Sequence, residues 1–409
     1  MESNPGLLPA DILLEIFSYC SYTDLVKFQS VCKWWQQVTR HKHLWKDIVY
    51  KPDWTDDAKQ IIENLKASPE LQALDLRYVK RSTVTKELVQ EIANGCPGLE
   101  QLTVLWDCLS EKIHVEIKKI KILILDFEDY DEVSLKFLQK YFPNVEHIDC
   151  SSLLIMESDL KAYLKKKRRS LHTAGFRCET YDSHCILPFL SVCTNLKSLT
   201  LFCLCDQIKL LNVQSMEHLK RISSLTLRDS KWSDMNDYLS LFAYFPNLVV
   251  LQLDKCTLHD EQPLRLVAEN CPLIEKLTLS SLGRYFRNRN LTYISNFKKL
   301  KFLCLRSNSY INDDCVVHLQ AILELRYLDI SDCEEVSPQC LLVLCSFDKL
   351  QTLKFDLQYC DLPANLGASH VKNPDLHIMF YNCKDTCVLD HLRRQRLRIS
   401  LLKEYSVWD

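Results

Sequence analysis

The sequence predicts an α/β solenoid that follows a short helical module. The first observation is an internal repeat of about 26 residues, in which apolar residues occupy positions one, four and six of a short template. The second is that amphipathic segments, such as residues 84–93 and 315–323, fill the sequence between templates. The third is a dense run of apolar residues at helical spacing within the first 47 residues. We therefore expect a curved domain with a concave parallel sheet and outer helices.

Each template copy predicts one short strand. The first positions of the copies are Leu71, Leu99, Ile120, Val145, Leu171, Leu196, Ile222, Leu248, Ile274, Leu300, Leu325, Leu350 and Leu376. Alternating apolar residues bury one face of a strand, and each repeat leaves an apolar face that only the next repeat can cover. Counting back 26 residues from Leu71 reaches Trp45, which adds a copy at Trp45, Ile48 and Tyr50. We therefore expect about 13–14 repeats and no flexible linker before them.

Composition argues against several classes of function. The 409 residues carry a formal net charge of -2, so no global basic field attracts nucleic acid or an anionic membrane. Only six glycines occur, and their positions cannot form a glycine-rich phosphate loop or a nucleophile elbow. We therefore predict no nucleic-acid or membrane partner, no cofactor and no catalytic residue. A catalytic triad assembled across repeats would leave no local motif, so a hydrolase is kept as a third alternative.

The 20 cysteines are interpreted as packed thiols. The sequence has no Cys-x-x-Cys spacing and begins without a recognisable secretory signal, which favours a reducing compartment. Two looser pairs offer a metal-binding alternative, namely Cys203 with Cys205, and Cys383 with Cys387 near His377 and His391. Packing is the simpler interpretation, and we predict no metal site.

Two details of the repeats indicate a particular family. Eight residues after the first template position stand Cys256, Asn308 and Cys333. Several strands are preceded by Cys-Pro or Phe-Pro, at residues 96–97, 142–143, 245–246 and 271–272. The repeat region resembles the cysteine-containing leucine-rich repeats. The resemblance implies that the Cys or Asn side chain bonds the backbone of the turn after each strand.

The N-terminal module also carries a family pattern. It reads Leu8-Pro9, Ile12-Leu13, Ile16-Phe17, Asp24-Leu25, Val31-Cys32 with Trp35, and Leu44-Trp45. Pro9 suits the first turn of one helix, and Thr23 is the expected N-cap of a second that continues through Trp35. The pattern resembles an F-box. We expect a three-helix F-box at residues 1–47, the solenoid at 48–381 and a C-terminal tail at 382–409.

The F-box resemblance implies docking on the Skp adaptor and, through it, on a cullin–RING assembly. The predicted adaptor-binding residues are Leu8, Pro9, Ile12, Leu13, Ile16, Phe17, Leu25, Val31, Cys32 and Trp35. The protein would then be the substrate-recognition subunit of a ubiquitin ligase that captures a protein substrate. One alternative is a scaffold or inhibitor that binds the adaptor without targeting substrates. Another is that the apolar stripe of the module merely caps the solenoid.

Substrate contacts are expected on the concave sheet, where template positions three, five and seven point outward. Exposed aromatic and arginine side chains are the usual anchors of interfaces. The candidates are Arg177, Phe202, Arg228, Phe302, Arg306 and Tyr327. Asp126, Asp254 and Asp356 share the outward positions, so a mixed-charge surface is favoured over a phosphate reader.

A basic run at residues 165–169 has two interpretations. Its sequence, Lys-Lys-Lys-Arg-Arg, is typical of nuclear localisation signals. It also ends a predicted outer helix, where basic residues interact favourably with the helix dipole. We expect the protein in the cytoplasm, with nuclear import as the alternative.

Overall fold

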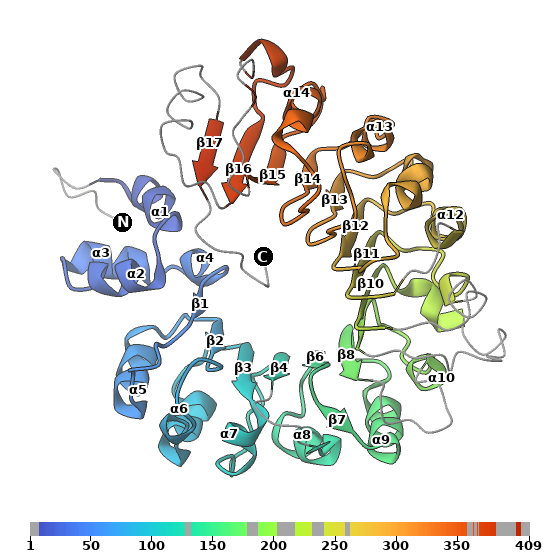
Figure 1. Ribbon diagram of the computed structural model, residues 1–409. Coiled ribbons are helices and arrows are strands. Elements are labelled where there is room, and N and C mark those ends of the chain that lie inside the picture. Colours follow the sequence, from blue (N-terminus) through green and yellow to red (C-terminus); the bar gives the residue numbers. More distant parts are fainter. Residues whose placement is uncertain are drawn as a thin grey trace. The chain divides into compact units, whose positions relative to one another are not determined.

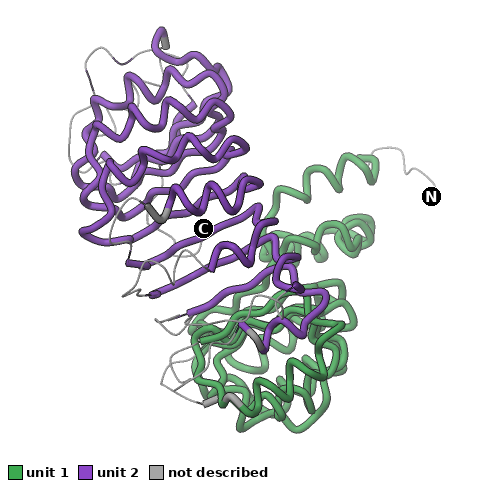
Figure 2. Tube along the Cα trace, turned by 90° about the vertical axis from the view of Figure 1, so that its right-hand side faces the viewer, with its two compact units in different colours: residues 1–180 green, residues 181–409 purple. Residues whose placement is uncertain are grey.

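The computed structural model divides the chain into two compact units, Met1–Thr180 and Tyr181–Asp409 (Figure 2). Its described residues are 8–126, 132–177, 187–202, 217–230, 241–257, 262–357, 363, 366, 368–381 and 398–401. Within each unit, strands line one side and helices lie on the other (Figure 1). Among these residues, no helix is long and apolar enough to cross a membrane.

The first unit begins with four short helices, whereas three were expected. They are α1 (Ala10–Ser18), α2 (Tyr22–Phe28), α3 (Lys33–Thr39) and α4 (Lys42–Trp45). Ser21, not Thr23, is the N-cap of α2, because its hydroxyl accepts from the Asp24 amide in a capping box. The expected second helix ends at Phe28, and Cys32 caps α3 by accepting from the Trp35 amide at 3.5 Å.

An aromatic core holds these helices together. The Phe17 ring lies 4.8 Å from that of Phe28 and 5.1 Å from that of Trp35, measured between centroids. Trp45 is 1% exposed, and its indole N–H donates to the Thr39 carbonyl at 2.6 Å. Forty residues thus bury several large rings and stay compact.

The main sheet of the first unit is parallel, and its strands follow the order of the chain. They are β1 (Val49–Tyr50), β2 (Ala73–Asp75), β3 (Gln101–Leu105), β4 (Ile122–Asp126), β6 (His147–Cys150) and β8 (Thr173–Arg177). A separate pair is formed by β5 (Glu132–Val133) and β7 (Leu154–Ile155). The covering helices are α5 (Ala58–Ala67), η1 (Arg81–Thr83), α6 (Lys86–Asn94), α7 (Trp106–Ser110), α8 (Leu135–Tyr141) and α9 (Glu157–Lys167).

The second unit repeats the same scheme. Its parallel strands are β9 (Ser198–Phe202), β10 (Ser224–Arg228), β11 (Val250–Asp254), β12 (Lys276–Ser280), β13 (Phe302–Cys304), β14 (Tyr327–Asp329), β15 (Thr352–Asp356), β16 (His377–Tyr381) and β17 (Arg398–Leu401). The described helices are α10 (Leu187–Leu190), η3 (Glu217–Arg221), α12 (Gln262–Asn270), η4 (Asn288–Asn296), α13 (Cys315–Leu319), η5 (Pro338–Cys340), α14 (Leu341–Leu344) and η6 (Ala368–His370).

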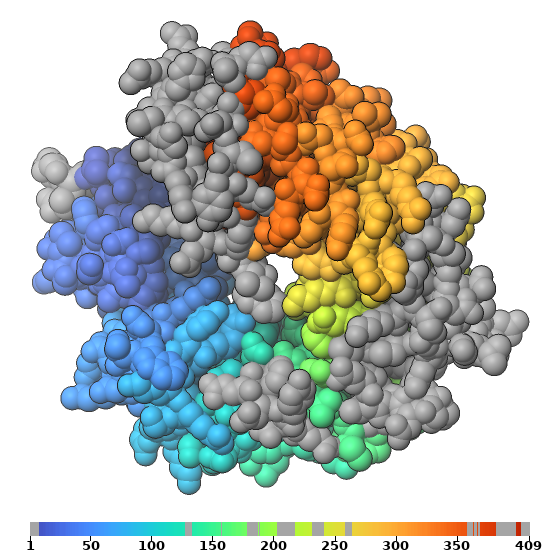
Figure 3. Space-filling view, viewed as in Figure 1, coloured from blue at the N-terminus to red at the C-terminus, as the bar shows by residue number. Residues whose placement is uncertain are grey.

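Burial follows the template and confirms the predicted fold class. Positions four and six are fully buried in successive repeats, as at Leu225, Leu227, Leu251 and Leu253. These leucines lie inside their unit, and Figure 3 shows the surface of the molecule in the same view as Figure 1. Helices are wider than strands, so each unit curves with its sheet on the inner side (Figure 1).

A left-handed residue ends five successive strands of the second unit. It occupies template position eight, and the residues are Asp229, Lys255, Ser281, Ser307 and Asp332, with φ between 47° and 59°. Position nine then bonds the backbone. Cys256 Sγ donates to the Leu227 carbonyl at 3.3 Å, and Cys333 Sγ donates to the Leu305 carbonyl at 3.2 Å. Both side chains thus bond a backbone carbonyl of the preceding repeat.

Two predicted registers were wrong. Tyr50 pairs with Leu74, so the first strand is shifted by two residues, and Trp45 ends α4 instead of starting a repeat. At the other end Thr352 pairs with His377, which places Ile378 and Phe380 on the buried template positions instead of Met379 and Tyr381. Residues 376–381 are apolar at almost every position, so hydrophobic alternation alone does not define their register.

Candidate adaptor-binding and substrate-binding surfaces

Helix α1 has two apolar faces. Leu13 and Phe17 lie on the buried face, where each is 1% exposed. A second face, about 100° around the helix, carries large apolar side chains at helical spacing that are exposed to solvent; we call it the α1 stripe. Its members are Leu8 (51% exposed), Ile12 (49%), Ile16 (47%) and Tyr19 (81%). Tyr19 was not predicted, although its spacing of three residues from Ile16 places it on the same face.

The other predicted adaptor-binding residues divide in the same way. Val31 is 58% exposed, and Cys32 and Pro9 are exposed as well. Leu25 is fully buried and Trp35 partly buried, so both belong with Leu13 and Phe17 to the core that supports the stripe. Buried side chains fix the position of α1, whereas only the exposed ones are available to a partner.

The start of α1 is attached to α3. The Trp34 indole N–H donates to the Leu8 carbonyl at 3.1 Å. Beside this bond lies a largely apolar cavity of about 190 Å³, lined by Ala10, Leu14, Trp34, Gln37, Val38, Arg40 and His41. At the other end of the stripe, the Tyr19 hydroxyl donates to Glu15 at 3.1 Å, which raises the pKa of Tyr19. Polar groups thus border the exposed apolar face.

An aromatic pair dominates the described sheet surface of the second unit. Phe302 and Tyr327 are neighbours in register on β13 and β14, and their rings stack at 4.1 Å with an interplanar angle of 9°. Lys354 Nζ lies 5.9 Å from the Tyr327 ring centroid, within the range of a cation–π contact. Burial and the neighbouring Asp329 carboxylate raise the pKa of Tyr327, so its hydroxyl stays protonated.

The remaining substrate candidates are spread over both units. Phe202 and Arg228 are register neighbours on β9 and β10, and both are partly exposed. Arg306 lies two residues beyond the end of β13 and is partly buried. Arg177 ends β8 in the first unit and is only 7% exposed, so the expectation of an exposed side chain fails for it.

Charges of both signs occupy the sheet surface of the first unit. Arg77 forms ion pairs with Asp75 at 2.8 Å and with Asp126 at 3.7 Å, and both partners raise its pKa. This pairing fits the expected mixed-charge surface better than a reader of phosphate groups.

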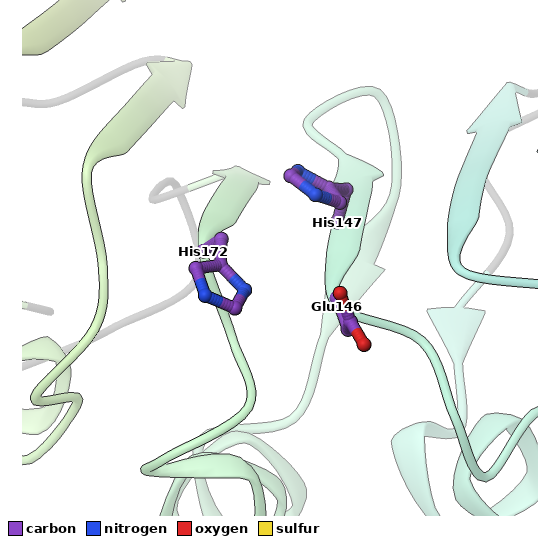
Figure 4. A group of neighbouring side chains, drawn as sticks. All are labelled: Glu146, His147 and His172. Atoms are coloured by element: carbon purple, nitrogen blue, oxygen red, sulfur yellow. The ribbon is translucent and has the colours of Figure 1, made fainter.

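Glu146, His147 and His172 form a group with metal-ligand chemistry (Figure 4). Their ligand atoms lie within 4.8 Å of one another, whereas Zn²⁺ at its usual bond length of about 2.1 Å needs ligand atoms roughly 3.4 Å apart. His147 Nδ1 already bonds the Thr173 hydroxyl at 2.9 Å, and buried His172 Nδ1 has no partner. The absence of a metal ion stays a prediction.

The described cysteines are all free thiols, and most are buried. Burial raises the pKa of several of them, for example to about 11 for Cys193 and to about 12 for Cys271. The proposed cysteine pairs at 203–205 and 383–387, and His391, lie outside the described residues. His377 bonds the Ser400 hydroxyl at 2.7 Å and is thereby engaged in the sheet.

A family model for F-box-like domains matches residues 6–51. The chain carries an F-box-like domain. No curated protein matches the sequence significantly. A chain of the yeast Rad7–Elc1 complex is similar over 90% of both chains, with a TM-score of 0.50 and 15% identity. An internalin from Listeria monocytogenes covers 98% of this chain and 100% of its own, with a TM-score of 0.39 and 16% identity. At such identities the likeness concerns the fold alone.

The F-box-like domain therefore contains the α1 stripe, and the repeats carry the Phe302–Tyr327 pair. Both present apolar or aromatic side chains, which are typical of surfaces that bind protein partners. Domains of the F-box-like family are typically not catalytic, and the match indicates no catalytic family.

Proposed function

We propose that this protein is the substrate-recognition subunit of a Skp–cullin–F-box ubiquitin ligase. The observation that carries the proposal is the α1 stripe, which exposes four large apolar side chains within the F-box-like domain. The stripe suits an apolar groove of the Skp adaptor, in the way that an amphipathic helix docks into a groove. Through the adaptor, the protein would join a cullin–RING assembly.

The repeats would capture the protein substrate. Stacked aromatic rings with a nearby cation supply the rigid anchors on which interfaces depend, and Phe302, Tyr327 and Lys354 have this arrangement. The turn bonds made by Cys256, Asn308 and Cys333 support assignment of the repeats to the cysteine-containing subtype. Such a receptor contributes by positioning the substrate, and the chemistry takes place on its partners.

We also propose a cytoplasmic location. Lys167, in the middle of the basic run, is 5% exposed and donates to the Pro143 and Val145 carbonyls. The run is therefore partly built into the solenoid, which disfavours its use as a nuclear signal. Imaging of a fluorescent fusion would test the location, and nuclear accumulation that depends on Lys165 and Lys166 would contradict it.

Two experiments, carried out one after the other, test the proposed function. Co-purification with the Skp adaptor should be lost in the double variant Ile12→Asp with Ile16→Asp. Proteins captured by the wild type, with cullin activation blocked, should then become ubiquitinated when activation is restored. Adaptor binding without such ubiquitination would contradict the ligase proposal and favour a scaffold or inhibitor.

A further inference from the structure

A pocket of about 410 Å³ lies at one edge of the first unit, where strands β3, β4, β6 and β8 begin. It is built from the segments that lead from the outer helices into these strands. Its lining is Pro97, Glu100, Lys118, Lys119, Lys121, Pro143, Asn144, Glu146, Lys167 and Ser170. Four lysines and two glutamates leave the lining with a formal charge of 4 - 2 = +2.

Two of the four lysines are partly desolvated and form no close ion pair among the described residues, although the charges of Glu91 and Glu146 act on Lys119 and Lys167, respectively. Lys119 Nζ donates to the Cys96 carbonyl, and Lys167 Nζ donates to the carbonyls of Pro143 and Val145. An ammonium group has three N–H donors, so both lysines retain donor capacity. Burial lowers the pKa of each, which reflects the cost of holding a cation away from water. A bound anion would offset that cost.

The other two lysines of the lining are more exposed to solvent, at 71% for Lys118 and 47% for Lys121. Lys121 pairs with Glu100 at 2.8 Å and Lys118 with Glu116 at 3.3 Å, in pairs that are roughly half exposed. Lys167 also belongs to the basic run at residues 165–169, which adds four more cations beside the pocket in sequence. Of this run, Lys167 alone lines the pocket.

We propose that this pocket binds a phosphate-type anion. Lysine ammonium groups act as point charges that suit phosphate oxygens, and the Ser170 hydroxyl and Asn144 amide add neutral donors. The phosphate has two sources, a phosphorylated side chain of the captured protein or a small free phosphate. Only the first source rests on the proposed function. The site lies at the strand beginnings of the first unit and is separate from the mixed-charge sheet surface.

The second unit offers a matched control. Lys298, Lys299 and Lys301 occupy the same template positions as Lys118, Lys119 and Lys121. The local ion pair is also the same, because Lys301 bonds Glu275 at 2.9 Å as Lys121 bonds Glu100. Equal substitutions in the two triplets change the net charge equally, and only one triplet lines the described pocket.

The experiment titrates inorganic pyrophosphate into the full-length protein by calorimetry at constant ionic strength. Lys118→Gln with Lys121→Gln should weaken binding at least tenfold, and Lys298→Gln with Lys301→Gln less than twofold. Both pairs are exposed enough to keep the fold, which circular dichroism would check. Equal weakening by the two pairs would mean general charge attraction, and no binding to the wild type would mean no site. Either result overturns the proposal.

A second arm identifies the source. A short phosphoserine peptide and its unphosphorylated form are titrated under the same conditions. If pyrophosphate binds, pocket-dependent binding of the phosphopeptide but not of its unphosphorylated form assigns the site to substrate recognition. Binding of pyrophosphate without binding of the phosphopeptide assigns it to a free phosphate. None of these titrations needs the adaptor, so their failure leaves the ligase proposal intact, and failure of adaptor binding leaves the anion site intact.

Discussion

The double variant Ile12→Asp with Ile16→Asp gives the sharpest test of the α1 stripe. Burying an isoleucine completely is worth about 1.5–3 kcal/mol, and the two side chains still expose 49% and 47%. Covering the rest would contribute about 1 kcal/mol each. Burying two carboxylates against an apolar partner costs several kcal/mol more. We therefore expect a loss of at least about 4 kcal/mol, or roughly a thousandfold in the adaptor Kd.

The choice of positions separates binding from folding. Phe17→Asp would place a charge among the Phe28 and Trp35 rings and unfold the module, so its loss of binding would carry no information about the interface. A suitable control is Val317→Asp with Leu323→Asp, because these apolar residues are 69% and 79% exposed in the second unit. Calorimetry with the purified adaptor measures the Kd, and circular dichroism measures the fold. A Kd within twofold of the wild type would refute the reasoning.

Four further outcomes are expected. Asn308→Ala should lower the free energy of unfolding in urea by about 3 kcal/mol or more, because its buried amide bonds two carbonyls and one N–H. Lys255→Val should be at least about 1 kcal/mol less stable than Lys255→Gly, since φ is 53° there. Burial raises the pKa of Cys271 to about 12, so the unfolded thiol loses its proton first; stability measured against pH should fall between about pH 9 and 12. Phe302→Ala with Tyr327→Ala should weaken substrate capture at least tenfold, measured by quantitative crosslinking, and leave adaptor binding unchanged.

The repeat made the solenoid predictable, because stacking requires the same residue to be buried at the same position of every repeat. Position nine is a different case, because its structural task was implied by the resemblance to the cysteine-containing leucine-rich repeats and not by spacing alone. Asn308 performs it with bonds to the carbonyls of Leu279 in β12 and of Leu305, which directly follows β13. Periodicity fails at the ends, where Trp45 packs into the helical module and residues 376–381 are apolar on both faces.

The candidate site was only partly predictable. The family pattern selects apolar residues of α1 without distinguishing its two faces, and contacts with Phe28 and Trp35 decide that Phe17 is core and Ile16 surface. An outward template position likewise does not predict which neighbouring side chains cover the residue that occupies it. Arg177 occupies such a position and is nevertheless buried. The lysine pocket was missed because its members come from four repeats that sequence alone does not bring together.

The junction between the F-box-like domain and the first repeat is formed by packed side chains. Tyr22 of α2 stacks on Tyr50 of β1 at 4.2 Å, and its hydroxyl donates to the Asn64 carbonyl of α5 at 3.3 Å. The Asn64 side-chain amide in turn donates to the Tyr50 hydroxyl at 2.7 Å. Three elements from both sides of residue 47 thus share one packed cluster, and burial raises the pKa of both tyrosines. Because Tyr22 of the module packs against the first strand and the helix that follows it, the F-box-like domain joins the first repeat through packed side chains and not through a flexible linker.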